Sequence, residues 1–369
     1  MSASTTDFQQ TALAKVAPGT LLRAGLDRIL LAGTGALVVL GDAAEVLEIC
    51  TGGFLIEAAF SPQKLFELAK MDGAIILSAN GTRIVRANVH LVPDPRLVTT
   101  ETGTRHRTAE RVALSVDAVV VAVSEELSVI SVYYRSNKQT LQPIPAVLSR
   151  ASQALSTLER YRERFESVLS NLAPLELVDQ VTFRDVLFAL QRGEMVRRIG
   201  AEIEGYLLEL GTDGRLLALQ SAEISLDFEE RFDSLIFDFL GYSDPIEIEA
   251  VRDSLGSLST DDVTDLRTFA NWVARQAICE PLRAVTIDHG DLSSVVLPSR
   301  GSRLLNSISR IPSSAVAALL DRYPSVAAIR LASEEELAAL DEIGPDWARL
   351  IRESLGVSPI VAPLERQNG

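Results

Sequence analysis

The stretch from Ser61 to Ala87, SPQKLFELAKMDGAIILSANGTRIVRA, decides the fold class. Ser61-Pro62 is typical of a helix start, with serine as the N-cap and proline at the first helical position. Short β-rich runs at 74–78 and 83–87 flank Asn80-Gly81, a dipeptide typical of a type I′ hairpin. A helix followed by a pair of strands predicts an α/β domain.

Further β-rich runs lie on both sides of this stretch, at 36–40, 117–123 and 129–134. A helix is predicted from near Thr108, because apolar residues recur at helical spacing after it. The longest apolar run, 29–40, is well short of the roughly 20 residues of a membrane helix, so it predicts a buried strand with a glycine turn. Residues 1–142 are therefore predicted to form an α/β domain, with a mixed central sheet flanked by helices.

The pattern becomes helical from Ile144. Apolar residues then recur at alternating four- and three-residue steps to Leu172, with Arg162 as the exception, which predicts a long helix that pairs with others. Two more helices are predicted, one from Thr182 to Gly211 and one over 215–240. The stretch 241–300 shows weak helical segments whose order stays open. Residues 143–300 are predicted to be an all-α spine.

The last region, 301–369, is predicted to hold short helices. Ser333 and Glu336 match a capping box, in which the two residues satisfy each other's backbone N–H groups at a helix start. Gly344-Pro345 then separates this helix from one predicted over 346–355. The pattern is helix, tight glycine turn, helix.

Charge and cysteine content narrow the function classes. The 369 residues include 35 Lys and Arg against 50 Asp and Glu, a net charge of −15, so bulk electrostatics do not attract the chain to nucleic acid or anionic membranes. Two distant cysteines form no disulfide framework, and the polar N-terminus lacks the apolar run of a signal peptide. These features predict a cytoplasmic protein.

Cations crowd the start of the helix predicted near Thr108, in the stretch 102–108 (TGTRHRT). A helix N-terminus carries unpaired N–H groups and partial positive charge, so these cations are disfavoured there unless an anion is bound. A phosphate would turn the same groups into a cooperative anion site, and Gly103 would allow close backbone approach. Equally open is a solvated loop whose arginines pair with Glu101 or Glu110.

Asp72 and Ser124 are the other polar residues at predicted element ends. Asp72 follows a helix predicted over 61–71, where the negative end of the helix dipole disfavours a carboxylate, so a metal ion, an arginine or a substrate hydroxyl should compensate. The alternative for Asp72-Gly73 is a simple turn, which the local sequence favours. Ser124 is well placed to contact a ligand at the end of a predicted strand.

Three stretches resemble the diadenylate cyclase domain: 70–74 (KMDGA), 87–95 (ANVHLVPDP) and 101–111 (ETGTRHRTAER). The whole chain resembles the family of bacterial DNA integrity scanning proteins, through 18–20 (PGT), 154–161 (ALSTLERY), 209–215 (ELGTDGR) and the terminal helices. The resemblance covers nearly the full length. The Asp-Gly-Ala and Arg-His-Arg motifs are specific in combination.

This resemblance implies an enzyme that joins two ATP into cyclic di-AMP and two pyrophosphates, with Mg²⁺ or Mn²⁺. In the family, cyclase domains meet face to face, each holds one ATP, and the 3′-hydroxyl of one nucleotide attacks the α-phosphate of the other. The resemblance also implies an octamer whose C-terminal helix-hairpin-helix domains bind branched DNA, coupling the activity to DNA damage and repair without a membrane partner. The alternative is a DNA-junction-binding scaffold whose nucleotide site senses without synthesising.

The site residues follow from the same resemblance. Asp72, Arg105 and His106 are the implied catalytic residues, and Asp72 is the implied metal ligand. The implied nucleotide-binding set is Asp72, Gly73, Ala74, Leu91, Gly103, Thr104, Arg105, His106, Arg107, Thr108 and Ser124. Leu91 would line the adenine site. The implied DNA contacts are Ile343, Gly344 and Arg349.

Two features depart from the family pattern. Glu125-Glu126 follow Ser124 where many relatives carry basic residues, which predicts weaker ATP binding or a metal ligand at Glu125. Glu342-Ile343-Gly344 has a carboxylate in place of the first glycine of the hairpin. Residues 301–369 also carry seven Arg, no Lys and nine Asp and Glu, so we expect weak DNA affinity beside cyclase activity.

Overall fold

The structure is a computed structural model that describes residues 8–127, 129–278 and 292–356. The chain divides into two compact units, Met1–Ser156 with Ala201–Ala222 and Thr157–Gly200 with Glu223–Gly369. Two long helices, α7 (Ile144–Glu176) and α8 (Phe183–Leu210), contribute residues to both units. The three-domain division at 142/143 and 300/301 stays a prediction.

An eight-stranded mixed sheet forms the centre of the first unit, in the order β2-β5-β4-β1-β6-β7-β8 with β3 paired to β5. The strands are β1 (Ala36–Leu40), β2 (Cys50–Thr51), β3 (Phe54–Ala59), β4 (Ala74–Leu77), β5 (Arg83–Leu91), β6 (Val119–Ser124), β7 (Val129–Tyr134) and β8 (Asn137–Leu141). β1 and β4 are parallel, and the other pairs are antiparallel. The predicted α/β class with a mixed sheet is confirmed.

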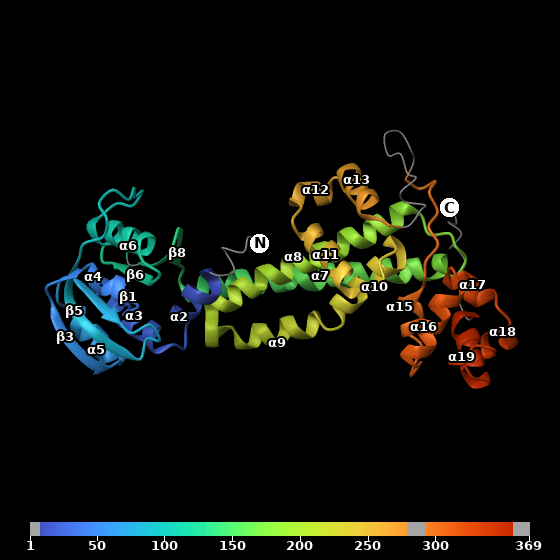
Figure 1. Ribbon diagram of the computed structural model, residues 1–369, viewed down its shortest axis with the longest axis horizontal. Coiled ribbons are helices and arrows are strands. Elements are labelled where there is room, and N and C mark those ends of the chain that lie inside the picture. The colour runs from blue at the N-terminus through green and yellow to red at the C-terminus, as the bar shows by residue number, and fades with distance from the viewer. Residues whose placement is uncertain (1–7, 128, 279–291, 357–369) are drawn as a thin grey trace, which may run out of the picture. The chain divides into compact units, whose positions relative to one another are not determined.

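Helices cover both faces of this sheet (Figure 1). α3 (Leu21–Leu31) and α5 (Pro62–Leu68) bury side chains with one face, and α4 (Ala44–Glu48) and α6 (Thr104–Ser115) bury side chains with the other. The central strands β1, β4 and β6 are apolar at nearly every position, and since successive residues point to opposite sides, both faces of the sheet are apolar. The predicted strand over 29–40 is partly wrong, since residues 29–31 end α3. Short helical segments η1 (Gln9–Leu13) and α2 (Ala14–Val16) precede α3.

The hairpin between β4 and β5 forms as predicted, but with a different turn. The Ser78 N–H donates to Arg83 O at 2.9 Å, and the Gly81 N–H donates to Ser78 O at 2.8 Å. Gly81 has a φ of 70°, whereas Asn80 is not in the left-handed region, so the type I′ prediction is wrong. Asn80 serves the turn through its side chain instead, because its Oδ1 accepts from Ser78 Oγ at 2.8 Å and from the Thr82 N–H at 3.1 Å.

The second unit is helical. Its later helices are α10 (Phe228–Leu240), α11 (Pro245–Gly256), α12 (Thr260–Thr264), α13 (Leu266–Gln276), α15 (Ser302–Asn306), α16 (Ser313–Arg322), α17 (Val326–Leu331), α18 (Glu334–Ala338) and α19 (Pro345–Gly356). η2 (Gly211–Gly214) and most of α9 (Arg215–Ile224), which follow α8 in the chain, belong to the first unit. The single helix predicted over 215–240 is wrong. Asp227 takes a left-handed conformation, with a φ of 59°, and separates α9 from α10.

Arg162, the exception in the apolar seam of α7, has a structural role in the second unit. Its Nε donates to Ile224 O at 3.3 Å and its Nη2 donates to Leu226 O at 3.2 Å, where α9 ends. Its guanidinium also lies 5.5 Å from the centroid of the Phe228 ring. Arg162 therefore satisfies carbonyl groups at a helix end, which explains a charge at a seam position.

The C-terminal helices share a core that includes Leu305, Leu319 and Ile351. The predicted capping box is confirmed, because the Glu336 N–H donates to Ser333 Oγ at 3.1 Å and the Ser333 N–H donates to Glu336 Oε2 at 2.8 Å. The helix predicted over 346–355 is present as α19. Within the described part of the chain, no helix is long and apolar enough to cross a membrane.

Candidate functional site

One edge of the sheet collects the residues that the sequence singles out in the first unit. β1 and β4 both start at this edge because they are parallel. β6 and β5 both end there, since β6 is antiparallel to β1 and β5 is antiparallel to β4. The strand order therefore brings together residues 72–74 before and at the start of β4, Leu91 at the end of β5 and Ser124 at the end of β6.

Helix α6 begins at Thr104, four residues earlier than the predicted start near Thr108. The Arg107 N–H already donates to Gly103 O at 3.1 Å, so the Arg-His-Arg stretch forms the first turn of the helix and not a preceding loop. Gly103, with a φ of 79°, supplies no side-chain cap, and the first turn contains no acidic residue. The backbone N–H groups of this turn therefore remain suited to an external anion.

Arg105 joins the helix start to the loop before β4. Its Nη2 lies 3.7 Å from Asp72 Oδ1, and the Asp72 side chain is 96% exposed. The guanidinium also lies against Gly35, where an added Cβ would stand 2.2 Å from Arg105 Nη1. Arg105 therefore supplies a positive partner for Asp72, and a side chain at position 35 would require its guanidinium to shift.

The loop that carries Asp72 is held by Gly73. Gly73 has a φ of 90°, and an added Cβ would lie 2.9 Å from Asn88 C and from Val89 O on the neighbouring β5. Only glycine fits this approach without strain. The helix predicted over 61–71 ends at Leu68, so Asp72 lies beyond the last turn of α5 and its partner comes from α6.

His106 points its ring toward β7. Its Nδ1 lies 2.8 Å from Tyr133 Oη, and its Nε2 is buried without a hydrogen-bond partner among the described residues. Burial is the main cause that lowers the pKa of His106, against the charge of Glu101, which raises it. The imidazole is therefore biased toward its neutral form in the free protein.

Comparison with known proteins identifies the family. The family model described as DisA bacterial checkpoint controller nucleotide-binding matches residues 23–138, and the DisA bacterial checkpoint controller linker region matches 141–277. The DNA integrity scanning protein DisA of Frankia casuarinae is 43% identical over 362 residues, 98% of each chain. Those of Symbiobacterium thermophilum (41%, covering 96% of this chain and 97% of the relative) and Kineococcus radiotolerans (44%, covering 96% of each) are similar over the same extent. The chain belongs to the DisA family.

The other nucleotide-site residues expected for a DisA protein lie within the matched nucleotide-binding region. Thr104 and Arg107 are exposed, and Thr108 Oγ1 donates to Thr104 O at 2.9 Å. Ser124 Oγ accepts from the Leu127 N–H at 3.2 Å. Ala74 and Leu91 are buried, with Leu91 6% exposed in the core beneath α6, so the expected contact of Leu91 with adenine stays a prediction.

The side chains at this edge of the sheet can be compared with the ligands of the Mg²⁺ or Mn²⁺ that the family resemblance implies. No group of three or more His, Cys, Asp and Glu side chains able to hold a metal occurs among the residues that the structure describes. Asp72 offers one exposed carboxylate. Mg²⁺ in phosphate sites is held by one or two carboxylates together with substrate phosphates, so this donor set fits a metal that arrives with a nucleotide.

The residues expected to contact DNA, Ile343, Gly344 and Arg349, lie in the second unit, before and within α19. Ile343 is 1% exposed and packs in the core of the terminal helices, so its part is to hold the turn before α19. Gly344 precedes α19, and an added Cβ there would meet nothing within 4 Å. Arg349 is exposed, and its Nε lies 3.6 Å from Glu334 Oε1. Contact of these residues with DNA stays a prediction.

Three residues at the site were missed by the sequence interpretation. Gly35 lies in an apolar run, and Tyr133 lies in a predicted strand, where an aromatic side chain indicates core packing. Lys138 lies beyond that strand, and its Nζ is 2.5 Å from Glu101 Oε1. No local pattern marks them, since each becomes part of the site only through strand pairing.

Proposed function

We propose that the chain is a diadenylate cyclase that joins two ATP into cyclic di-AMP with release of two pyrophosphates. The observation that carries the proposal is the approach of Arg105 to Asp72 at 3.7 Å, at the uncapped start of α6. A carboxylate and a cluster of phosphate-binding groups then lie at one sheet edge. In each half-reaction the 3′-oxygen bonds to an α-phosphorus, the bond from that phosphorus to the β-phosphate oxygen breaks, and pyrophosphate leaves.

Each copy of the chain holds one ATP in this proposal. The α6 N-terminus binds phosphate oxygens through Thr104, Arg105, His106, Arg107 and Thr108, which neutralises charge at the reacting phosphate. Asp72 orients the 3′-hydroxyl of its own nucleotide and accepts its proton. Because attack requires the α-phosphate of a second nucleotide, two copies face each other, and the proposed assembly is an octamer built from four such pairs.

A bound Mg²⁺ or Mn²⁺, held by Asp72 and the nucleotide phosphates, would supply charge neutralisation at the triphosphate. The exposed Glu125 and Glu126 follow Ser124 at the same edge. Their negative charge repels a triphosphate, so we expect ATP to bind more weakly than in a protein with basic residues there.

Incubation of the purified chain with ATP and Mg²⁺ or Mn²⁺, followed by chromatography, tests the proposal. We expect cyclic di-AMP and pyrophosphate in a 1:2 ratio, and no product from 3′-deoxy-ATP, which lacks the attacking hydroxyl. ATP binding without cyclic di-AMP would instead support the alternative, a DNA-junction-binding scaffold with a sensing site.

Branched DNA is expected to bind weakly and with steep salt dependence. The C-terminal helices have no lysine, Glu342 lies in the turn before α19, and Glu334 pairs with Arg349 at 3.6 Å. Binding would rest on phosphate contacts, each of which displaces counterions, so the affinity should fall steeply as salt rises. Fluorescence anisotropy with a four-way junction between 50 and 200 mM salt measures this, and Glu342→Gly should tighten binding. Tight, salt-insensitive binding by the unchanged chain would contradict the prediction.

A further inference from the structure

The His106 ring contacts Tyr133, and Tyr133 lies close to Lys138, which pairs with Glu101. Tyr133, in β7, is 1% exposed, and its hydroxyl lies 2.8 Å from His106 Nδ1. Glu101 precedes α6, and its carboxylate is 13% exposed. Lys138, opposite Tyr133 on β8, places its Nζ 2.5 Å from Glu101 Oε1 and 5.7 Å from the centre of the Tyr133 ring.

The direction of the hydroxyl proton follows from these neighbours. Burial raises the pKa of Tyr133 well above its usual range, and the negative charge of Glu101 raises the pKa further. Tyr133 therefore keeps its proton. The negative charge of Glu101 also attracts the hydroxyl proton, which leaves the hydroxyl oxygen as an acceptor for the Nδ1–H of His106.

We propose that Tyr133 is a positioning residue for His106: its hydroxyl oxygen accepts the Nδ1 proton, so that the neutral imidazole presents an unprotonated Nε2 to the nucleotide. The Lys138–Glu101 pair sets this arrangement by orienting the hydroxyl. The assignment of Nε2 to the nucleotide rests on the proposed function, whereas the tautomer is a property of the free protein.

The orphaned Nε2 supports the assignment. This atom is buried and has no partner among the described residues. A buried polar atom without a partner is unfavourable unless a ligand satisfies it. When a triphosphate binds, its negative charge favours imidazolium, so Nε2 takes a proton from solvent and donates it to a phosphate oxygen. Nucleotide binding is then accompanied by proton uptake.

The charged groups around His106 allow a test with opposite signs. Glu101 raises the pKa of His106, whereas Lys138 and Arg105 lower it. Glu101→Gln is expected to lower the pKa of His106, and Lys138→Met is expected to raise it. A loss of packing alone would not give shifts of opposite sign at one ring.

Nitrogen NMR of histidine-labelled full-length protein, free of nucleotide, is the decisive measurement. The chain has three histidines, so a His106→Gln sample assigns the signals. Above the pKa, we expect the proton of His106 on Nδ1 in the unchanged protein, and a shift toward protonated Nε2 in Tyr133→Phe. Tyr134→Phe is the matched control, because Tyr134 belongs to the core on the other face of the sheet, and it should leave the His106 signals unchanged.

The rate of cyclic di-AMP formation is the second measurement. Tyr133→Phe should lower kcat about 10–100-fold with little change in KM for ATP, since a misplaced group costs up to about 10²-fold. Calorimetry with 3′-deoxy-ATP in buffers of different ionisation enthalpy should show proton uptake that His106→Gln removes. A wild-type protein with the proton on Nε2, or a Tyr133→Phe protein with unchanged His106 signals, would overturn the positioning role whether or not cyclic di-AMP is made. A protein with the expected tautomer and no cyclic di-AMP would overturn only the proposed function.

Discussion

Replacement of Asp72 by asparagine is expected to lower the rate of cyclic di-AMP formation by about 10²–10⁴-fold, the range that a positioned proton acceptor contributes. Asparagine keeps the size of the side chain, but its amide does not take up the proton of the 3′-hydroxyl. The Asp72 carboxylate is 96% exposed, and its pairing with Arg105 is long at 3.7 Å, so the fold does not depend on it. Chromatographic rates measure the loss, and size-exclusion chromatography checks that assembly is intact.

Asp117 offers a matched control for this variant. Its carboxylate is 66% exposed and lies 3.2 Å from Arg135 Nε, just before β6 begins and therefore at the opposite edge of the sheet from Asp72. Asp117→Asn removes the same charge from the same domain and should keep the wild-type rate. If Asp72→Asn also turned over at the wild-type rate, Asp72 would have no part in the mechanism.

Local patterns were sufficient for those parts of the fold whose forces are local. Ser61 and Ser333 each cap a helix through a neighbouring backbone N–H, and both starts were predicted from the residues alone. The apolar seam from Ile144 to Leu172 likewise predicted α7, because a helix repeats its buried face at fixed spacing.

The errors occur where side chains or backbone conformation override propensity. Asn80 forms hydrogen bonds through its side chain and leaves the left-handed conformation to Gly81, so the hairpin turn differs from the type that its sequence favours. Asp227 interrupts an apolar helical pattern with a single left-handed residue. A short break of this kind has no periodic signal.

The motifs of the site were predictable from the sequence, but the residues that hold the motif side chains in place were not. Asp72 and the Arg-His-Arg turn were singled out from their positions at element ends and from the family resemblance. The packing of Arg105 on Gly35 depends on the β4-β1-β6 order, and the contact of His106 with Tyr133 depends on the next strand, β7. Such contacts are set by the non-local order of strands, which one sequence does not reveal.

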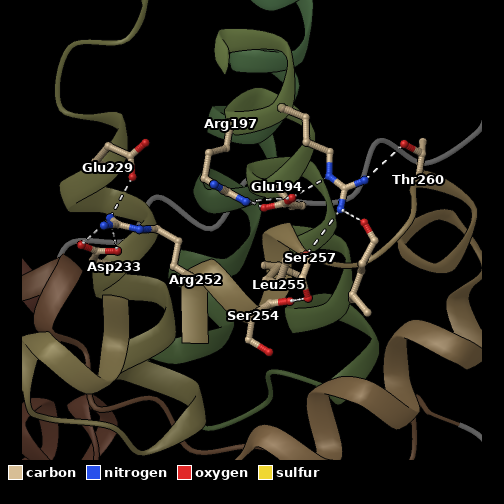
Figure 2. Close-up of polar contacts among 11 residues, drawn as sticks. Glu194, Arg197, Glu229, Asp233, Arg252, Ser254, Leu255, Ser257 and Thr260 are labelled. Carbon is tan, nitrogen blue, oxygen red and sulfur yellow. Dashed lines mark hydrogen bonds and ion pairs between the residues drawn. The ribbon is translucent and has the colours of Figure 1, made fainter. Parts of the chain in front are cut away.

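A second large effect is expected in the helical unit, where Glu194→Gln should lower the free energy of unfolding by about 3–5 kcal/mol. The Glu194 side chain is fully buried on α8, and Figure 2 shows the guanidinium of Arg197 directed at its carboxylate. Arg197 Nε donates to Glu194 Oε2 at 2.9 Å, and Arg198 Nε donates to Glu194 Oε1 at 2.6 Å. A neutral amide leaves two largely buried cations without their counter-charge.

The same cluster holds the end of α11 in place. Arg198 Nη2 donates to Leu258 O at 2.7 Å, and its Nη1 donates to Thr260 Oγ1 at 3.2 Å. Arg197 lies so close to Gly256 that an added Cβ would stand 2.0 Å from its Nη2. The carboxylate therefore orders two arginines that satisfy and pack against the end of a neighbouring helix, and its loss weakens those contacts together.

Denaturant unfolding followed by tryptophan fluorescence measures this effect, because both tryptophans, Trp272 in α13 and Trp347 in α19, belong to the helical unit. Glu229→Gln is the control. Its carboxylate is 56% exposed and pairs with Arg252 at 2.9 Å (Figure 2), and an exposed pair of this kind contributes about 0–1 kcal/mol. The two glutamates differ in burial and in partners, because Glu194 is fully buried and accepts from two arginines, whereas Glu229 is exposed and shares Arg252 with Asp233. If Glu194→Gln destabilised the protein no more than Glu229→Gln, the buried charge would not be what holds α11 against α8.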